Sequence, residues 1–147
     1  MEVIIVKKAG CILLNNDKTK VALVYREKRN DYSFPKGHVE GNEKLWECAI
    51  RETEEETGRE CILFSKRLHT KMKYFTSTEG NVTVYMFYAF DNGETIKDIN
   101  PLDKECLIWV KLEDVVDILT YDNLKEFWSK ALLKINNIRR NLWIKEI

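Results

Sequence analysis

The sequence predicts an α+β fold in which helices cover a mixed β-sheet. The order of its periodic segments is strands, helix, strands and helix, which is typical of such layered folds. The chain has 147 residues without an internal repeat or a linker-like segment, so we expect a single domain over residues 1–147. Hydrophobic residues make up 44% of the chain, enough to form a core at this length.

Composition argues against several classes of protein. The 24 Lys and Arg residues balance the 24 Asp and Glu residues, so the basic surface expected of a bulk nucleic-acid binder is missing. Residues 80–90, the longest stretch without a charge, are too few to cross a bilayer as a helix. The short N-terminal apolar run precedes its lysines, unlike a signal peptide. The four cysteines lack zinc-site spacing, so we expect reduced core residues in a cytoplasmic protein without a membrane partner.

The first half of the chain predicts a β-hairpin followed by a helix. The apolar runs Ala9–Leu14 and Val21–Tyr25 flank an Asn-Asn-Asp sequence that favours a turn. Good helix formers then extend over Glu43–Thr57, with Asn42 as the expected N-cap and Gly58 as the expected stop.

The second half predicts three more strands and a long helix. We expect strands at residues 61–74, 81–90 and 107–111, where β-branched and aromatic residues are frequent. From Leu124 onward, apolar residues recur at helical spacing and alternate with lysines and arginines. We interpret this segment as a helix packed on the sheet with a solvated basic face, and the alternative is a surface for nucleic acid or membrane.

The end of the first helix carries an unusual cluster of glutamates. Glu52, Glu54, Glu55 and Glu56 lie at the helix C-terminus, where the helix dipole favours cations. At 100° per residue, Glu52, Glu55 and Glu56 extend the apolar stripe of the helix, whereas Glu54 points away. Carboxylates clustered beside a core are stabilised when they bind a divalent cation such as Mg²⁺. The residues alone therefore favour a metal site, and an acidic surface patch stays open as the alternative.

Charge is also separated along the chain. Residues 18–36 hold six basic and two acidic side chains, whereas residues 43–60 hold seven acidic and three basic ones. Residues 66–73 add four basic side chains and no acidic one. A phosphorylated ligand matches both halves, because its oxygens bind a metal on the carboxylates while Lys and Arg contact the remaining oxygens.

The segment from Gly37 to Arg59 resembles the Nudix box, G-x5-E-x7-R-E-U-x-E-E-x-G-U. All seven fixed letters are present, as Gly37, Glu43, Arg51, Glu52, Glu55, Glu56 and Gly58. The two U positions, which the family fills with large apolar residues, hold Thr53 and Arg59. Because neither U position binds metal in the family, the departures concern local packing.

The resemblance implies a Nudix-type αβα sandwich, with a mixed β-sheet between helices. It also implies a hydrolase that cleaves a nucleoside diphosphate linked to another moiety, with Mg²⁺ or Mn²⁺ as cofactor. Glu52, Glu55 and Glu56 correspond to the metal-binding glutamates of the family, and the carbonyl of Gly37 to a further ligand. The metals would neutralise the polyphosphate and lower the pKa of a bound water.

The resemblance assigns supporting and catalytic roles as well. Arg51 would orient the glutamates by ion pairing, and Glu43 would brace the loop against the helix. Glu52 and Glu55 count with Arg51 as catalytic candidates. The family varies in its general base, so Glu55 and the downstream acids Asp103 and Glu105 all stay open.

Outside the box, the run from Tyr32 to Glu40 is similar to the W-x-x-P-K-G-H-V-E run of the asymmetric diadenosine tetraphosphate hydrolases. Tyr32 replaces the tryptophan, and Tyr74 lies sixteen residues beyond Gly58, where that branch has a tyrosine. By resemblance, Lys36 and His38 would contact phosphate, Tyr74 would stack on adenine, and Tyr32 counts with them as a substrate-binding candidate. The alternatives are packing for Tyr74 and a structural turn for His38.

Together these features predict a pyrophosphohydrolase that uses water to cleave diadenosine tetraphosphate to ATP and AMP. The expected partner is a small nucleotide, and nucleic acid is not the expected partner. The alternatives are another substrate, namely a diphosphoinositol polyphosphate, a nucleoside triphosphate or an RNA 5′ end, or a nucleotide-binding module without catalysis.

Overall fold

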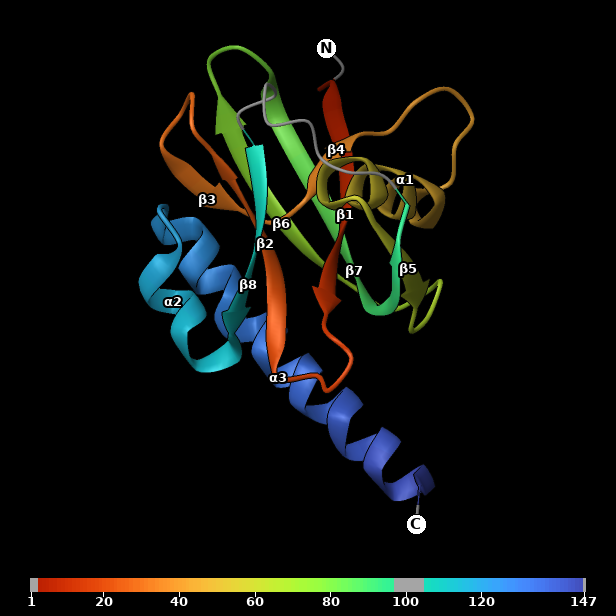
Figure 1. The fold of residues 1–147 in the computed structure, drawn as a ribbon. Coiled ribbons are helices and arrows are strands. Elements are labelled where there is room, and N and C mark those ends of the chain that lie inside the picture. The colour runs from red at the N-terminus through yellow and green to blue at the C-terminus, as the bar shows by residue number, and fades with distance from the viewer. Residues whose placement is uncertain (1–2, 97–104, 147) are drawn as a thin grey trace.

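The computed structural model describes residues 3–96 and 105–146 (Figure 1). The elements follow in the order β1 (Ile5–Leu14), β2 (Lys20–Arg26), β3 (Asp31–Ser33), β4 (Lys36–His38), α1 (Leu45–Thr57), β5 (Arg59–Leu63), β6 (His69–Thr76), β7 (Gly80–Thr95), β8 (Glu105–Lys111), a 3-10 turn (Leu112–Asp114), α2 (Val115–Ile118) and α3 (Asp122–Glu146).

The sheet is mixed, as the sequence predicts. Its central pair, β1 and β7, is parallel from Ile5 opposite Asn81 to Leu14 opposite Phe90. All the other strand pairs among the described residues are antiparallel. The main strand order is β3-β2-β1-β7-β5, with β4 paired to β1, β6 to β7 and β8 to β2. Because β4 pairs with β1 beside β2, the residues before α1 are held against the middle of the sheet.

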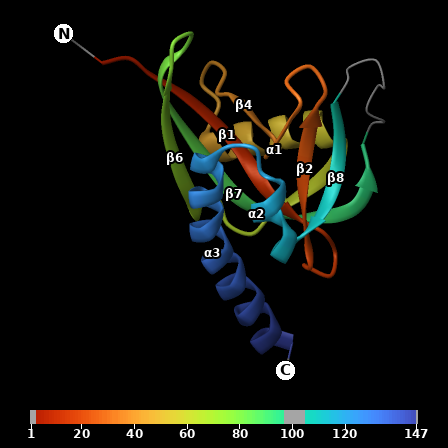
Figure 2. The ribbon, with the colours of Figure 1, turned by 90° about the vertical axis from the view of Figure 1, so that its left-hand side faces the viewer.

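Helices cover both faces of this sheet, which confirms the predicted sandwich (Figure 2). The alternation of side chains along β1 divides the core in two. Cys11 and Leu13 pack with Cys48 and Ala49 of α1. Neighbouring even-numbered residues of β1, such as Ile12, instead pack in the larger cluster that contains the apolar side of α3.

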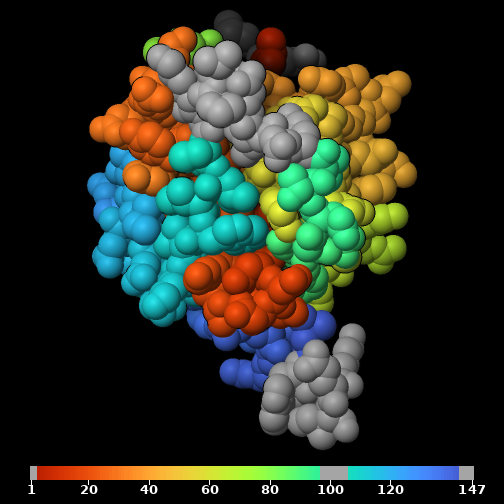
Figure 3. All heavy atoms as spheres, viewed as in Figure 1, coloured from red at the N-terminus to blue at the C-terminus, as the bar shows by residue number. Residues whose placement is uncertain are grey.

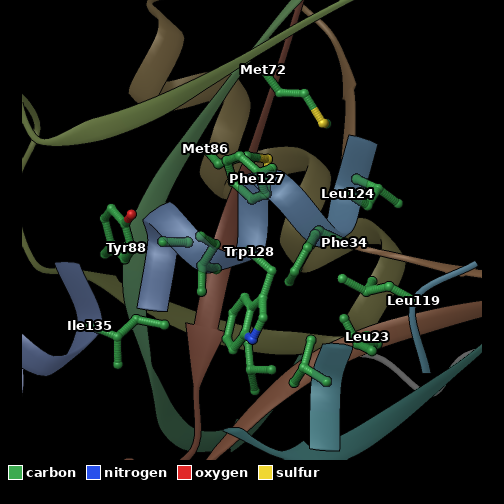
Figure 4. Packing of buried hydrophobic residues seen from close by; sticks show 14 of the residues in the cluster. Leu23, Phe34, Met72, Met86, Tyr88, Leu119, Leu124, Phe127, Trp128 and Ile135 are labelled. Carbon is green, nitrogen blue, oxygen red and sulfur yellow. The ribbon is translucent and has the colours of Figure 1, made fainter. Parts of the chain in front are cut away.

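Aromatic side chains fasten the start of α3 to the sheet (Figure 4). Phe34, between β3 and β4, stacks on Trp128 at 5.7 Å and meets Phe127 edge-on at the same centroid distance. All three side chains are at least 96% buried. Each contributes roughly 1.5–3 kcal/mol through the removal of apolar surface from water. This packing fixes the N-terminal part of α3 beside the strand that begins at Lys36.

The C-terminal part of α3 extends past the ends of the strands (Figure 1) and projects from the body of the molecule (Figure 3). Its buried positions, which include Ala131, Ile135 and Ile138, face the core, whereas Lys130 and Arg139 are exposed. The prediction of a packed helix with a solvated basic face is therefore confirmed. Within residues 3–96 and 105–146, no helix has the length and apolar character needed to traverse a membrane.

The predicted strand at residues 61–74 is wrong as a single element, because it is split into β5 and β6. The hydroxyl of Ser65 accepts hydrogen bonds from the backbone N–H groups of Arg67 and Leu68, which closes the turn between them. The two strands pair with different parts of β7, since β5 lies along its C-terminal half and β6 along its N-terminal half. The length of β7 accommodates both, and it exceeds the predicted span of residues 81–90.

The predicted start of the first helix is also wrong. Helix α1 begins at Leu45 rather than Glu43, and its N-cap is Lys44 rather than Asn42. The carboxylate of Glu47 accepts a hydrogen bond from the Lys44 N–H at 3.0 Å, which satisfies one of the free donors at this end. Glu43 stays in the preceding loop, where its side chain is free to turn toward the helix.

The predicted helix stop is confirmed. The predicted hairpin is confirmed only near its turn. Gly58 follows α1 with a φ of +70°, the left-handed conformation that favours glycine. Strands β1 and β2 pair antiparallel at Leu14 and Val21. Beyond that point β1 pairs with β4 and β7, while β2 pairs with β3 and β8. The short strands β3 and β4 were not predicted, because three residues give too little periodicity.

Candidate active site

Arg51, in the middle of helix α1, is the centre of an ion-pair network that joins this helix to the loop before it. Its Nε and Nη2 atoms donate to the two carboxylate oxygens of Glu43 at 2.7 and 2.9 Å. Its Nη1 atom donates to Glu52 at 2.8 Å, and Nη2 also donates to the carbonyl of His38 at 3.0 Å. The hydrogen bonds from Arg51 lower the pKa of Glu43 to about 2. Arg51 thus joins the loop after β4 to α1 through Glu43 and the carbonyl of His38.

Gly37 and Glu52 are in direct contact. A Cβ atom built on Gly37 would overlap the carboxyl group of Glu52, so only glycine leaves room for this carboxylate. The side chain of Glu52 is 15% exposed. The structure therefore brings together two of the four predicted metal-site residues.

Glu55 and Glu56 lie in different environments. The side chain of Glu55 is 51% exposed and 3.4 Å from the Nη1 atom of Arg51, so it does not extend the buried stripe as predicted. Glu56 is partly buried, and its charge acts on Lys36. Glu54 accepts a hydrogen bond from the backbone N–H of Cys61 at 3.0 Å and so faces β5, away from the other three carboxylates.

The donor set around Gly37 suits a hard divalent cation. The side chains of Glu52, Glu55 and Glu56 and the carbonyl of Gly37 supply only oxygen atoms, the ligands that Mg²⁺ and Mn²⁺ prefer. Within residues 3–96 and 105–146, however, no three metal-ligating side chains converge as a ready-made site. Glu52 and Glu55 are instead drawn toward the guanidinium of Arg51. The residues fit such a metal by their chemistry, and Glu52 and Glu55 would have to turn away from Arg51 to bind it.

The two departures from the box have structural explanations. Thr53 is fully buried, and its hydroxyl accepts a hydrogen bond from the Cys11 N–H at 2.9 Å, which ties α1 to β1. Arg59 forms a two-point ion pair with Asp91 of β7 at 3.1 and 2.9 Å. Polar contacts therefore hold this segment where the family uses apolar packing.

A cavity of about 380 Å³ opens beside this segment on the α3 side of the sheet. Its lining combines four cations with aromatic and small polar side chains. The lining residues are Lys8, Arg26, Arg29, Ser33, Lys36, Met72, Tyr74, Phe75, Thr76, Thr78, Glu79, Tyr121, Asn123 and Leu124. Among the described residues no carboxylate of α1 lines the cavity, but the charge of Glu56 acts on Lys36 and Arg26 in its lining.

Lys36 is placed to meet an anion in this cavity. Burial, together with the nearby charges of Arg26 and Lys8, lowers the pKa of Lys36 to about 8, although Glu56 acts in the opposite direction. A phosphate oxygen next to its ammonium group would favour the charged form. The phosphate contact of Lys36 stays a prediction.

Tyr74 lines the same cavity, and Tyr121 faces it as a second aromatic residue. Tyr121 immediately precedes α3, and its hydroxyl donates to the buried carboxylate of Asp31 at 2.9 Å. Asp31 also accepts two hydrogen bonds of 2.7 Å from Arg26. Burial acts to raise the pKa of Asp31, but the bonds from Arg26 and Tyr121 outweigh it and hold that pKa below its usual range.

The sequence did not identify Tyr121, Asp31 and Arg26 as site residues. For Tyr121 the reason is that helical periodicity begins only at Leu124. The sequence did contain one signal for Tyr121, namely an aromatic residue just before the predicted helix, the start of which packs against the core. That signal does not reveal which strand the residue faces.

Two predicted binding residues are placed outside the cavity lining. The ring of Tyr32 packs against Tyr25 with centroids 4.9 Å apart. The Nε2 atom of His38 lies 2.7 Å from the carboxylate of Glu79. Of the two downstream acids, Asp103 lies outside the described residues, and the backbone of Glu105 begins β8 opposite Arg26.

Comparison with known proteins decides the family. The family model described as the NUDIX domain matches residues 6–131. The chain belongs to this family. The resemblance read from the Gly37–Arg59 segment is thereby confirmed, and the relatives include two enzymes named as phosphatases.

One relative matches along almost its whole length. The chain is 24% identical over 131 residues to the asymmetrical bis(5′-nucleosyl)-tetraphosphatase of Caenorhabditis elegans, covering 86% of this chain and 94% of the relative. A structure titled as the C. elegans Ap4A hydrolase has a TM-score of 0.68, with 24% identity and coverage of 88% and 99% of the two chains. A binary complex of that hydrolase gives a TM-score of 0.71 at 22% identity, with coverage of 90% and 98%. The structural likeness confirms the fold.

Two further relatives are much longer than this chain. It is 29% identical over 102 residues to an 8-oxo-(d)GTP phosphatase of Mycolicibacterium smegmatis, covering 69% of this chain and 30% of the relative. It is 30% identical over 113 residues to an m7GpppN-mRNA hydrolase of C. elegans, covering 72% of this chain and 14% of the relative. In these two relatives, the matched region is a minor part of the whole protein.

Proposed function

We propose that this protein hydrolyses a phosphoanhydride bond of a nucleoside polyphosphate, with a divalent metal ion, and that diadenosine tetraphosphate is cleaved to ATP and AMP. The observation that carries the proposal is the cavity whose lining combines Tyr74 and Tyr121 with four cations. The charge of Glu56 on α1 acts on two of these cations, Lys36 and Arg26. Aromatic rings suit a nucleobase, and clustered Lys and Arg suit a polyphosphate. The match to the C. elegans tetraphosphatase over nearly its full length favours this substrate.

The metal would be held by Glu52, Glu55, Glu56 and the carbonyl of Gly37. Bound there, Mg²⁺ or Mn²⁺ would neutralise phosphate charge and lower the pKa of a coordinated water. Arg51 balances the charge of this cluster and restrains Glu52, and Glu43 fixes Arg51 through its two-point ion pair.

The remaining roles belong to the cavity. Lys36 would bind a phosphate oxygen, and Tyr74 would stack on a base, an interaction of about 1–3 kcal/mol. Tyr121 would present a second ring. Glu55, with half of its side chain exposed, would accept a proton from water.

Anion-exchange analysis of diadenosine tetraphosphate incubated with the protein tests the proposal directly. With Mg²⁺ we expect equal amounts of ATP and AMP, and with EDTA we expect intact substrate. The variants Glu55→Gln and Glu56→Gln should lose turnover while keeping the fold by circular dichroism. Glu54→Gln is the matched control on the same helix, because its amide oxygen still accepts the hydrogen bond from Cys61.

Intact substrate in the presence of Mg²⁺ would contradict the proposed substrate. A panel of 8-oxo-dGTP, capped RNA, a nucleoside triphosphate and a diphosphoinositol polyphosphate would then identify the hydrolysed bond. Capped RNA belongs in the panel because of the 30% identity to the mRNA hydrolase. Saturable nucleotide binding without any product would instead indicate a non-catalytic module.

A further inference from the structure

Glu79 stands out in the cavity because it is the one acidic side chain among the described residues that line it. It lies in the turn between β6 and β7, directly before Gly80. Its backbone N–H donates to the hydroxyl of Thr76 at 2.9 Å, and Gly80 has a φ of +77°. The turn thus holds this carboxylate over the edge of a cavity that is otherwise cationic.

The carboxylate of Glu79 joins two donors from two other strands. One oxygen is 2.9 Å from the Nζ atom of Lys8 on β1, and the other is 2.7 Å from the Nε2 atom of His38 on β4. Lys8 and His38 lie opposite each other in the β1–β4 pairing. The side chains of Lys8 and Glu79 are 14% and 27% exposed, so their contact is shielded from water more than a surface pair is.

Lys8, His38 and Lys36 form one row of basic side chains on the same face of the β1–β4 pair. His38 and Lys36 are two residues apart on β4, and their partners on β1 are Lys8 and Gly10. Side chains two residues apart on a strand share a face and lie about 6.6 Å apart along it. Lys8 and Lys36 both line the cavity, so a chain of phosphates that starts at Lys36 and grows along this row meets Lys8 next.

We propose that Glu79 limits the length of the polyphosphate chain that the cavity accepts, by occupying Lys8 and His38 in place of a phosphate. A phosphate that reaches Lys8 must displace the carboxylate or lie beside it, and like charges repel in a partly buried site. A shorter chain that ends at Lys36 does not meet this charge. Glu79 therefore acts as a specificity-determining residue, and the inference rests on the proposed function for the class of ligand.

The test is the equilibrium binding of diadenosine tri-, tetra-, penta- and hexaphosphate in EDTA, by isothermal titration calorimetry. EDTA prevents metal-dependent turnover, so the result is independent of whether the protein hydrolyses these compounds. In Glu79→Gln we expect the affinity for the penta- and hexaphosphate to rise about tenfold, with less than a twofold change for the triphosphate. The added Lys8→Gln change should remove this gain.

Glu94→Gln is the matched control, because it makes the same charge change at an exposed position of β7 that does not line the cavity. An equal gain for all four ligands in Glu79→Gln would mean a general charge effect and would overturn the proposal. Unchanged or weaker binding of the long ligands, or no binding by the wild type, would overturn it too. Turnover without this length dependence would refute this inference alone. Length-dependent binding without turnover would refute the proposed catalysis alone.

Discussion

The backbone of Gly37 lies against the carboxyl group of Glu52, so that strand β4 and helix α1 meet at a point where no Cβ atom fits. Gly37 is held there by the pairing of β4 with β1, opposite Ala9. Glu52 is held from the other side by its 2.8 Å hydrogen bond from Arg51. The position of the carboxylate at the candidate metal site is therefore set jointly by a strand and a helix.

Replacement of Gly37 by alanine should damage this contact. The new Cβ atom must push Glu52 away or shift β4, and a displacement of about 1 Å in an active site lowers the rate roughly 100-fold. Overpacking of this kind also lowers the free energy of unfolding by about 1–3 kcal/mol. Diadenosine tetraphosphate hydrolysis and urea unfolding of Gly37→Ala measure the two effects.

Gly93→Ala provides the comparison for this variant. Gly93 has a φ of +81°, and a Cβ there would meet only the side-chain nitrogen of Asn16 at 3.9 Å, an ordinary contact. Alanine should therefore reduce stability through backbone strain and leave the rate unchanged. A Gly37→Ala protein with wild-type turnover would show that the contact with Glu52 is not required.

The ion pair between Glu43 and Arg51 predicts a specific dependence of stability on pH. The pKa of Glu43 falls from 4.5 to about 2 on folding, so the pair stabilises the folded state fully above pH 4.5. This contribution is lost as the pH falls from 4.5 toward 2, because the unfolded chain takes up the proton in this range while the folded protein does not. In Glu43→Gln we expect a loss of roughly 1 kcal/mol in the free energy of unfolding at pH 7, and a smaller difference near pH 2–3.

Urea unfolding at several pH values, with Glu94→Gln as the exposed control, measures this difference. A constant difference between wild type and Glu43→Gln from pH 7 to pH 2 would contradict the assigned pKa. An effect of the same size in the control would show that the loss is not specific to the pair.

Asp31 predicts an effect on stability and on ligand binding together. The change Asp31→Asn removes the charged partner of Arg26 and weakens the bond from Tyr121, which should cost roughly 1.5–3 kcal/mol in the free energy of unfolding. Because Arg26 and Tyr121 both line the cavity, the KM for diadenosine tetraphosphate should rise more than kcat falls. Chemical denaturation and steady-state kinetics measure the two quantities.

Tyr121→Phe separates the two parts of this effect. It removes only the hydrogen bond to Asp31 and keeps the ring, so its loss of stability should be about 0.5–1.5 kcal/mol. A larger loss in Tyr121→Phe than in Asp31→Asn would be incompatible with Asp31 as the residue that anchors both side chains.

Much of the candidate site was predictable because it is local in sequence. Gly37, Glu43, Arg51 and the glutamates of α1 form one loop–helix segment, and helical geometry sets their mutual directions over a few turns. The predictions failed where local preference competes with longer-range contacts. Asn42 is a good N-cap by propensity, yet the helix begins at Leu45. In the same way, Glu55 turned out half exposed, with Arg51 as its nearest described ionic partner.

The sequence alone determined the alternation of strands and helices, the identity of the carboxylate cluster and the family to which the chain belongs. Those features depend on periodicity and spacing, which a linear chain carries explicitly. Only the tertiary structure decided that Tyr121 lies in one cavity with Tyr74, that Asp31 fixes Arg26, and that Glu79 binds Lys8. These contacts join residues from different strands and helices, and sheet order and packing, rather than sequence separation, bring them together.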